Sequence, residues 1–411
     1  MTKPQHHAVV VIGAGIAGAT IANELLERGQ AVCNIDAASS PATACSNHAH
    51  AIAHPHIGKG SPRLLRLTRI AFLLAESRWG ATWNQHGIFQ PSKKDRIFDQ
   101  AEVSRRLCEL HLDDGIAMAL NSNEAEALCG VKHSGVWLPR GASLDLSKAA
   151  QELLKPHPNL RCYWDTRITR LEKCNLGWML FNSENVALVS ASKVVIAAAM
   201  ESKALVGTIN VRLPLRPVRG QLSIFSISAN DPWIQKLPRI AITGDGYCLP
   251  AERLNDGSYR WIVGSSFDEG EDDLQARDSS DEFNRIQAKG LVNYGEGNSD
   301  SLKRVGNFIG IRCVAGDRLP IIGALTQRPG IFLATALGSR GALWSALAAK
   351  LISAQVLDDD FALLARFGFA ADLVAALAPA RFFAGALVVA PALGTFASNS
   401  KPILPSGPKA K

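Results

Sequence analysis

The sequence predicts a mixed α/β protein, with one domain built on a largely parallel sheet and a second, antiparallel-sheet domain interleaved with it. Residues 8–12 form a continuous apolar run that leads into a glycine-rich turn and a helical pattern. The same order of strand, glycine turn and helix returns at residues 331–357. Between the two, residues 215–267 alternate strand-like segments with turns, which is typical of an antiparallel sheet.

The length of the chain supports two domains. Its 411 residues exceed the roughly 250–300 residues at which a single hydrophobic core stops growing. We expect the first domain to be discontinuous and the second to be inserted in it. The predicted parts are residues 1–75, 145–215 and 305–385 for the first domain, 76–144 and 216–304 for the second, and a disordered tail at 386–411, rich in Pro, Ser, Gly and Lys.

The first strand, turn and helix can be placed residue by residue. Residues 8–12 are β-branched and apolar, as expected for a strand buried on both faces. A glycine turn follows, and residues 19–28 are good helix formers that Gly29 terminates. A second strand, residues 31–35, ends at Asp36.

This segment carries a dinucleotide fingerprint of the Rossmann-like kind, Gly13-x-Gly15-x-x-Gly18. Gly13 permits the tight turn, Gly15 lets the backbone approach a pyrophosphate, and Gly18 lets helix and strand pack closely. The anion is expected at the helix N-terminus. Asp36 would accept the ribose hydroxyls and repel a 2′-phosphate, which favours FAD or NAD over NADP. A methyltransferase that binds S-adenosylmethionine can show a similar turn and acid.

The later segments complete both predicted sheets. Residues 166–199 form a meander that returns to the first sheet, and residues 268–282 are an acidic loop and helix start. Near the end, a strand at 331–336 leads through Gly338, Arg340 and Gly341 into a helix at 342–357. The N–H groups of this turn could face the pyrimidine end of a flavin, which favours FAD. The alternative is an ordinary strand-to-helix connection.

Composition narrows the class of protein further. The formal net charge of +7 favours an anionic partner such as nucleic acid, although a mild positive excess also serves solubility. The eight cysteines contain no C-x-x-C pair and are predicted to be reduced thiols. The N-terminus lacks the features of a secretory signal, and charged residues and prolines interrupt the apolar region 361–397. We expect a cytoplasmic protein without a membrane anchor.

Seven segments carry a resemblance to a known family: residues 10–18, 46–47, 217–221, 245–247, 310–313, 317–320 and 335–341. Over about residues 8–383 the chain resembles the D-amino acid oxidase and glycine oxidase superfamily of flavoproteins. Within it, the chain is similar to the FAD-dependent branch of bifunctional bacterial enzymes that make 5-methylaminomethyl-2-thiouridine at the tRNA wobble position.

The resemblance implies an activity and site residues. The first domain would bind FAD, with Ser46 and Asn47 near the flavin, and the second would bind substrate. The substrate would be 5-carboxymethylaminomethyl(-2-thio)uridine in the anticodon region of tRNA, oxidised to the 5-aminomethyl nucleoside and glyoxylate, with O2 as the expected electron acceptor. Arg312 matches the superfamily's carboxylate-binding arginine and Tyr247 a tyrosine that assists it. Arg219 and Gln221 belong to the predicted catalytic site as residues that shape it.

The chain also departs from this family pattern. It begins at the flavin fingerprint, so we expect a separate methyltransferase to carry out any later methylation. Asp36 stands where a longer Glu is usual, and residues 197–200 replace a strand end that contains glycine. Three alternatives stay open: an oxidase of glycine, sarcosine or D-amino acids, a methyltransferase, and a non-catalytic flavin-binding partner of tRNA.

Two further clusters are ambiguous from sequence. His48, His50, His54 and His56 could suggest a metal site, but flavin chemistry needs no metal and we predict none. The arginines at positions 63, 66 and 69 and the basic run 93–96 could contact tRNA phosphates, or could equally be a solvated basic face.

Overall fold

A computed structural model describes residues 4–58, 60–93, 97–113, 115–292, 302–359 and 361–383. The predicted tail at 386–411 and three residues of the basic run, 94–96, lie outside the described residues. No helix in the described part of the chain is long and apolar enough to cross a membrane.

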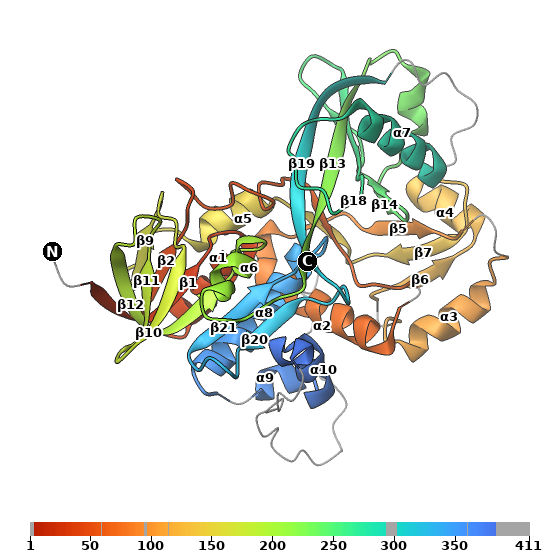
Figure 1. The fold of residues 1–411 in the computed structure, drawn as a ribbon. Coiled ribbons are helices and arrows are strands. Elements are labelled where there is room, and N and C mark those ends of the chain that lie inside the picture. Colours follow the sequence, from red (N-terminus) through yellow and green to blue (C-terminus); the bar gives the residue numbers. More distant parts are fainter. Residues whose placement is uncertain are drawn as a thin grey trace.

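The first sheet has a parallel centre and lies on the left in Figure 1. Its central strand β1 (Gln5–Ile12) pairs in parallel with β2 (Val32–Ile35) and β12 (Ala187–Ile196). The other parallel partners are β9 (Leu160–Tyr163) beside β2 and β21 (Ile331–Thr335) beside β12, and the antiparallel strands are β10 (Arg170–Cys174), β11 (Gly177–Phe181) and β20 (Ile321–Ala324). The predicted meander that returns to this sheet is confirmed.

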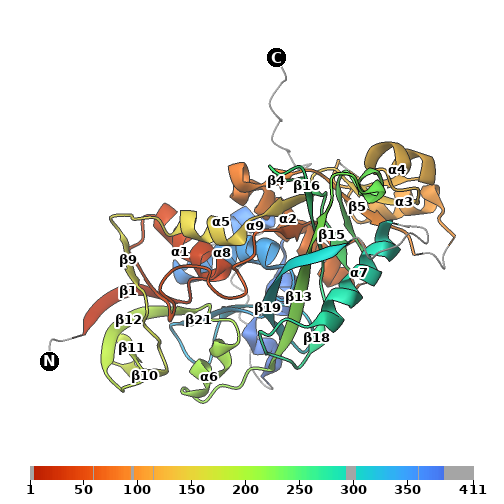
Figure 2. The ribbon, with the colours of Figure 1, turned by 90° about the horizontal axis from the view of Figure 1, so that it is seen from above.

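Strand alternation separates the two faces of this sheet. Val9 and Val11 of β1 face the larger core, whereas Val10 and Ile12 pack with the meander on the opposite face. The helices of the larger core are α1 (Ile16–Glu27), α2 (Pro62–Trp79), α5 (Leu146–Leu153) and α8 (Gly341–Val356), and α6 (Glu201–Gly207) covers the other face. Helices from both ends of the sequence therefore pack side by side, α1 against α8 (Figure 2).

Helix α1 begins three residues earlier than predicted. Gly15 is its N-cap, in an extended conformation with ψ of 179°, so the helix starts inside the glycine turn and includes Gly18. The predicted end is confirmed: Gly29 follows the last turn with a φ of +76°, a conformation that glycine adopts without strain.

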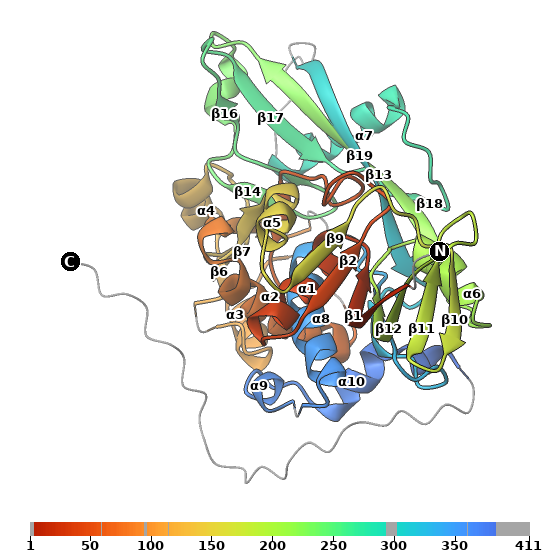
Figure 3. The same cartoon turned by 90° about the vertical axis from the view of Figure 1, so that its left-hand side faces the viewer.

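The second sheet is built on a long antiparallel pair, β13 (Leu215–Ile227) and β19 (Lys303–Ala315) (Figure 3). Beyond β13 the order continues through β17 (Tyr259–Gly264), β15 (Tyr247–Cys248), β14 (Ala241–Thr243), β5 (Ile88–Pro91), β7 (Gly135–Leu138) and β6 (Met118–Leu120), with β16 (Glu252–Arg253) beside β17 and β18 (Asp268–Glu269) beside β13. Helix α7 (Asp278–Val292) packs on β13 and β17. The antiparallel prediction is confirmed except at one junction, because β14 and β5 pair in parallel.

Smaller elements surround the two sheets. A third sheet joins β3 (Ala51–Ala53), β8 (Ala142–Leu144) and β4 (Asn84–Gln85). The other described helices are α3 (Gln100–Glu109), α4 (Ser122–Cys129), α9 (Ala362–Ala365) and α10 (Ala371–Leu377), with short 3-10 turns at Gly80–Thr82, Pro232–Lys236 and Pro379–Phe382. The predicted domain boundaries near 215 and 305 fall at the start of β13 and inside β19, and the division into domains stays a prediction.

Candidate active site

A cavity of about 730 Å³ connects the two sheets. One part of its wall is Gly15–Ala17 at the start of α1, and another is Gly338–Leu343 at the start of α8. Gly220 of β13, Tyr247 of β15 and Arg312 of β19 line it from the second sheet. The volume lies within the range of about 300–1,000 Å³ that cofactor and ligand pockets usually have.

The first glycine turn can be built only from glycine. Gly13 has a φ of +105°, and a Cβ there would lie 2.5 Å from the carbonyl oxygen of Ala197. A Cβ on Gly18 would strike the carbonyl oxygen of Gly13. Gly15 caps α1 without a side-chain hydrogen bond, and Ser46 Oγ accepts a 3.0 Å bond from the N–H of Ile16. This helix start suits a pyrophosphate, which backbone N–H groups and the helix dipole stabilise.

Asp36 lies beside this turn, as its proposed role requires. Its Oδ2 accepts from the N–H of Ala14 at 2.5 Å and its Oδ1 from the N–H of Ala38 at 2.8 Å. Asp36 and Asn47 are not among the residues that line the cavity. Asn34, which the sequence analysis missed, is fully buried and donates to the carbonyl oxygen of Gly13 at 3.1 Å. A polar side chain inside an apolar strand was the signal that could have revealed it.

The second glycine turn opens onto the same cavity. Gly338 has a φ of +56°, and its N–H donates to the carbonyl oxygen of Cys313 at 3.0 Å. Arg340 is the N-cap of α8 and its Nη2 lies 3.3 Å from His56 Nδ1. Burial lowers the pKa of Arg340 from its usual value. Both helix starts therefore face one cavity, which fits a cofactor with phosphates at one end and a reducible ring at the other.

Arg312 is a partly buried cation held by neutral oxygens. Its Nη1 donates to the carbonyl oxygens of Ser266 at 3.3 Å and Arg219 at 3.4 Å, and its Nη2 donates to Ser265 Oγ at 2.5 Å. Burial lowers its pKa. Among the described residues no carboxylate forms an ion pair with it. A partly buried positive charge on a cavity wall, with no ion-pair partner in the described part of the chain, is suited to bind a carboxylate.

Gly220 makes room for this guanidinium. The two residues lie on adjoining strands, where Gly220 pairs with Gly310 and Arg312 pairs with Val218. A Cβ on Gly220 would strike the guanidinium of Arg312. The glycine of the Arg219-Gly220-Gln221 motif is thus required by a side chain on the neighbouring strand.

Tyr247 lies in the same cavity with His48. Its hydroxyl oxygen is 3.3 Å from His48 Nε2 and 3.4 Å from the carbonyl oxygen of His50. Burial raises the pKa of Tyr247. Burial, then His50 and Arg312, lower the pKa of His48 to about 3, and its ring stacks on Phe308 at 5.0 Å. Both side chains are therefore uncharged at neutral pH. The sequence analysis considered His48 only as a metal ligand, predicted no metal there, and missed this contact.

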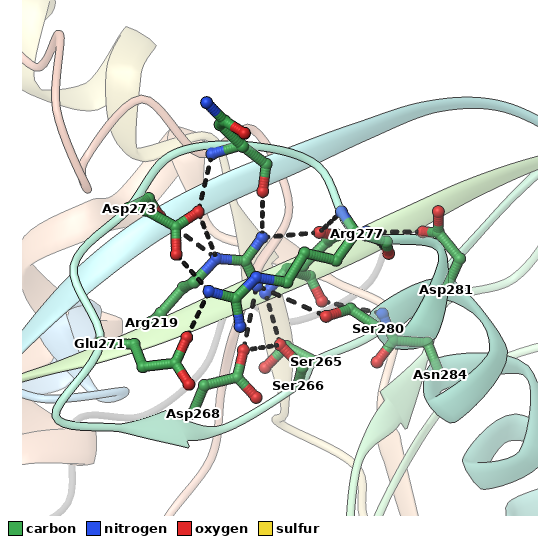
Figure 4. Close-up of polar contacts among 12 residues, drawn as sticks. Arg219, Ser265, Ser266, Asp268, Glu271, Asp273, Arg277, Ser280, Asp281 and Asn284 are labelled. Carbon is green, nitrogen blue, oxygen red and sulfur yellow. Dashed lines mark hydrogen bonds and ion pairs between the residues drawn. The ribbon is translucent and has the colours of Figure 1, made fainter.

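Arg219 and Gln221 lie on the other face of β13 and do not line the cavity. Figure 4 shows Arg219 among its polar partners. Arg219 is fully buried and pairs with Asp268 at 3.0 Å. It also donates to Gln221 Oε1 at 2.9 Å and to the carbonyl oxygen of Asp273 at 3.2 Å. Arg219 and Gln221 therefore organise the segment that follows β17. They can contribute to the predicted catalytic site only through Arg312, which donates to the carbonyl oxygen of Arg219.

The histidine and arginine clusters have other contacts. No group of three His, Cys, Asp or Glu side chains in the described residues is placed to hold a metal ion. His54 Nδ1 donates to the carbonyl oxygen of Pro55 at 2.9 Å, and burial lowers the pKa of His54 to about 4. On α2, Arg66 pairs with Asp372 at 3.0 Å and Arg69 donates to the carbonyl oxygen of His111 at 2.7 Å. Contact of this helix with tRNA stays a prediction.

Taken together, two helix starts and an arginine around one cavity, between a parallel and an antiparallel sheet, define a flavin-dependent oxidoreductase. The family model described as FAD dependent oxidoreductase matches residues 8–355. The chain belongs to this family, and its cofactor is FAD.

Several known proteins are similar to the chain. The tRNA 5-methylaminomethyl-2-thiouridine biosynthesis bifunctional protein MnmC of Ralstonia nicotianae is 32% identical, and the match covers 93% of this chain and 61% of that protein. The protein of the same name from Cupriavidus necator is 28% identical with the same coverage of both chains. The chain thus spans about three fifths of the length of these relatives.

Solved structures agree on the fold. Glycine oxidase from Geobacillus kaustophilus superimposes with a TM-score of 0.69 at 19% identity, over 87% of this chain and 96% of that one. L-proline dehydrogenase from P. horikoshii gives a TM-score of 0.68 at 14% identity, over 89% and 97% of the two chains. At these identities the likeness concerns the fold, a Rossmann-like FAD-binding domain with an antiparallel sheet, as predicted.

Proposed function

We propose that this chain oxidises the carboxymethylamino group of 5-carboxymethylaminomethyl(-2-thio)uridine at the wobble position of tRNA. The observation that carries the proposal is the partly buried guanidinium of Arg312 on the cavity wall, which pairs with no carboxylate among the described residues and suits the carboxylate of an N-substituted glycine. The names of the relatives, which are tRNA 5-methylaminomethyl-2-thiouridine biosynthesis proteins, support tRNA as the carrier of that group.

The residues of the cavity have distinct parts in this proposal. Arg312 holds the carboxylate with two charge-assisted hydrogen bonds, and Tyr247, which stays protonated because burial raises its pKa, donates to it. His48 is uncharged at neutral pH and adds no second positive charge. The positive charge of Arg312 lowers the pKa of the nearby substrate amine, so the amine is neutral more often. When bound, FAD supplies the two-electron acceptor for the C–H bond beside the amine.

The proposed reaction balances. The methylene between carboxylate and amine loses a hydride and the nitrogen loses a proton, which forms a C=N bond. Water adds to that carbon and the C–N bond breaks, so glyoxylate and the primary amine of the 5-aminomethyl nucleoside are released. With O2 as the final acceptor, one O2 becomes one H2O2. A methyltransferase would act on the primary amine afterwards.

The decisive experiment is anaerobic mixing of the FAD-loaded protein with its candidate substrates. We expect tRNA that carries the carboxymethylaminomethyl group to remove the yellow flavin absorbance and to yield glyoxylate. Mature tRNA without this group is the matched control. Loss of absorbance with glycine or sarcosine but not with tRNA would show a small-molecule oxidase instead, because Arg312 can also hold a free amino acid.

A further inference from the structure

We propose that Phe267 is a stacking platform for the pyrimidine ring of the nucleotide substrate, at the mouth of the cavity. The inference rests on the proposed function and adds a base-binding subsite to it. Phe267 lines the cavity, yet 49% of its surface is exposed. Isolated exposed aromatic residues are common on protein surfaces, so the argument depends on where this ring lies and how its backbone is held.

The ring of Phe267 lies directly beside the carboxylate anchor. The Cζ atom of Arg312 is 5.3 Å from the ring centroid. Arg312 is only partly exposed, whereas Phe267 is 49% exposed, so the pair leads from the interior of the cavity towards its mouth. A ligand whose carboxylate is bound by Arg312 would extend past this ring.

The backbone on both sides of Phe267 is anchored in the buried polar cluster of Figure 4. The N–H of Ser266 donates to the carbonyl oxygen of Gln221 at 3.1 Å, and Ser266 Oγ accepts from the N–H of Gln221 at 3.1 Å. On the other side, the Asp268 carboxylate pairs with the fully buried Arg219 at 3.0 Å. The exposed ring is therefore held in place before a ligand arrives, which lowers the entropy cost of binding.

The spacing fits the proposed substrate. Four single bonds separate the carboxyl carbon from ring carbon C5 of the uracil, which is about 5 Å in an extended chain. Because the Cζ atom of Arg312 lies over the Phe267 ring at 5.3 Å from its centroid, a chain of this length is long enough to reach from the guanidinium to the side of the ring. A carboxylate on Arg312 would place the uracil at the depth of the phenyl ring, where a base taken out of the anticodon loop can stack on an aromatic side chain. A free amino acid would end before reaching this ring.

A cation lies at the same mouth. Arg318 lines the cavity, its side chain is 69% exposed, and Glu269 holds it at 3.1 Å. Glu269 follows Phe267 by two residues, so ring and cation are presented by neighbouring segments. This combination of an aromatic ring and an exposed guanidinium matches a nucleotide, which offers a planar base and a phosphate.

The test compares Phe267→Ala with Phe267→Tyr in the FAD-loaded protein, using modified tRNA as substrate. We expect Phe267→Ala to raise KM for tRNA by about 5- to 150-fold, the range for loss of one base–aromatic stack. Flavin reduction at saturating tRNA should stay within about twofold. Phe267→Tyr keeps the ring and should retain a KM close to wild type. Phe283→Ala is the matched control, because Phe283 is 42% exposed on α7 and does not line the cavity.

Inhibition by a small carboxylate distinguishes two roles of Phe267: stacking on the base, and support of the Arg312 side chain. Acetate should inhibit wild type and Phe267→Ala with the same inhibition constant. An unchanged KM for tRNA in Phe267→Ala, or acetate inhibition weakened as much as tRNA binding, would overturn the platform and leave the proposed function standing. If wild type is not reduced by modified tRNA at all, the proposed function fails and the base-binding subsite fails with it.

Discussion

At the scale of single residues, the proposed chemistry depends on the positive charge of Arg312, which has no carboxylate partner in the part of the chain that the structure describes. The guanidinium of Arg312 is fixed by carbonyl and hydroxyl oxygens and has no described carboxylate partner. Burial of such a group costs free energy, and an incoming carboxylate recovers it. The free-energy cost of desolvating this guanidinium is thus incurred when the chain folds, and substrate binding does not incur it again.

Arg312→Ala should keep FAD and lose turnover. Removal of one partner of a buried, charge-assisted pair typically costs about 2–5 kcal/mol, so we expect kcat/KM to fall by about 30- to 4,000-fold. Flavin absorbance of the purified variant checks cofactor retention. Arg312→Lys serves as the conservative comparison and should recover only part of the activity. Unchanged turnover in Arg312→Ala would remove this residue from the site.

Gly220→Ala should displace the same guanidinium from a different strand. The added Cβ would strike Arg312, so KM should rise while FAD stays bound, measured by steady-state kinetics and flavin absorbance. Gly207→Ala is the control, because a Cβ at Gly207 meets nothing within 4 Å. Equal KM values for the two variants would contradict the packing described here.

His48 should make the folded state sensitive to acid. Its pKa is about 3 when folded and about 6.5 when unfolded. Between these values the unfolded chain binds a proton that the folded chain does not, so the free energy of unfolding falls as pH drops below about 6.5, by at most about 1.4 kcal/mol per pH unit. Urea unfolding at pH 7 and pH 5.5 measures this loss, and His48→Gln should reduce it. His54 contributes in the same direction. An equal loss in His48→Gln would contradict the assignment.

At the scale of elements, the sequence predicted what local patterns encode. The apolar runs and glycine turns predicted β21 and α8 to within one residue, and they predicted the end of β1 but placed its start three residues too late. The start of α1 was placed too late because Gly18 counts against a helix by propensity, whereas its lack of a Cβ is what lets the first turn approach Gly13. The parallel pairing of β14 with β5 was not predictable, because it joins segments far apart in the sequence.

For the site too, the sequence predicted what a local motif encodes and missed what depends on contacts between distant segments. Arg312 and Tyr247 were found through the family resemblance, and the structure brings both to one cavity. Period-two alternation along β13 places Arg219 on the face opposite Gly220, but the sequence does not tell which face borders the cavity. His48 lies in an irregular loop, where no periodic pattern reports burial.

Gly18→Ala should disrupt the junction of β1 and α1. Because a Cβ there would strike the carbonyl oxygen of Gly13, the turn must move and FAD should bind at least about tenfold more weakly, measured by flavin fluorescence titration. Gly290→Ala in α7 is the matched control, since a Cβ at Gly290 meets nothing within 4 Å. That substitution should leave FAD affinity unchanged and increase helix stability by up to about 1 kcal/mol. Equal FAD affinity in both variants would contradict this role of Gly18.

At the scale of the whole molecule, one cavity joins segments from across the chain. Its wall combines the starts of α1 and α8 with residues of β13, β15 and β19. A ligand that fills it contacts both sheets at once. Bound FAD should therefore stabilise both sheets against unfolding, and not one sheet alone.

FAD should raise the free energy of unfolding of the whole chain. At a free concentration 100 times its Kd, linkage predicts about 2.7 kcal/mol. Urea unfolding of apoprotein and FAD-loaded protein, followed by tryptophan fluorescence and by far-UV circular dichroism, measures the difference. Coincident transitions in both signals are expected in the presence of FAD. Equal unfolding midpoints with and without FAD would contradict the central position of the cavity.

The placement of α8 against α1 has a consequence for biosynthesis. Strand β1 leaves the ribosome long before its later partners: its neighbour β12 pairs with β21, and α8 covers α1 only once Gly341–Val356 has emerged. At a synthesis rate of about 5–20 residues per second, the delay between synthesis of the first glycine turn and synthesis of α8 is on the order of tens of seconds. Capture of FAD should thus be a late event in synthesis, and the early chain should depend on chaperones to protect the edge of β1 that later pairs with β12.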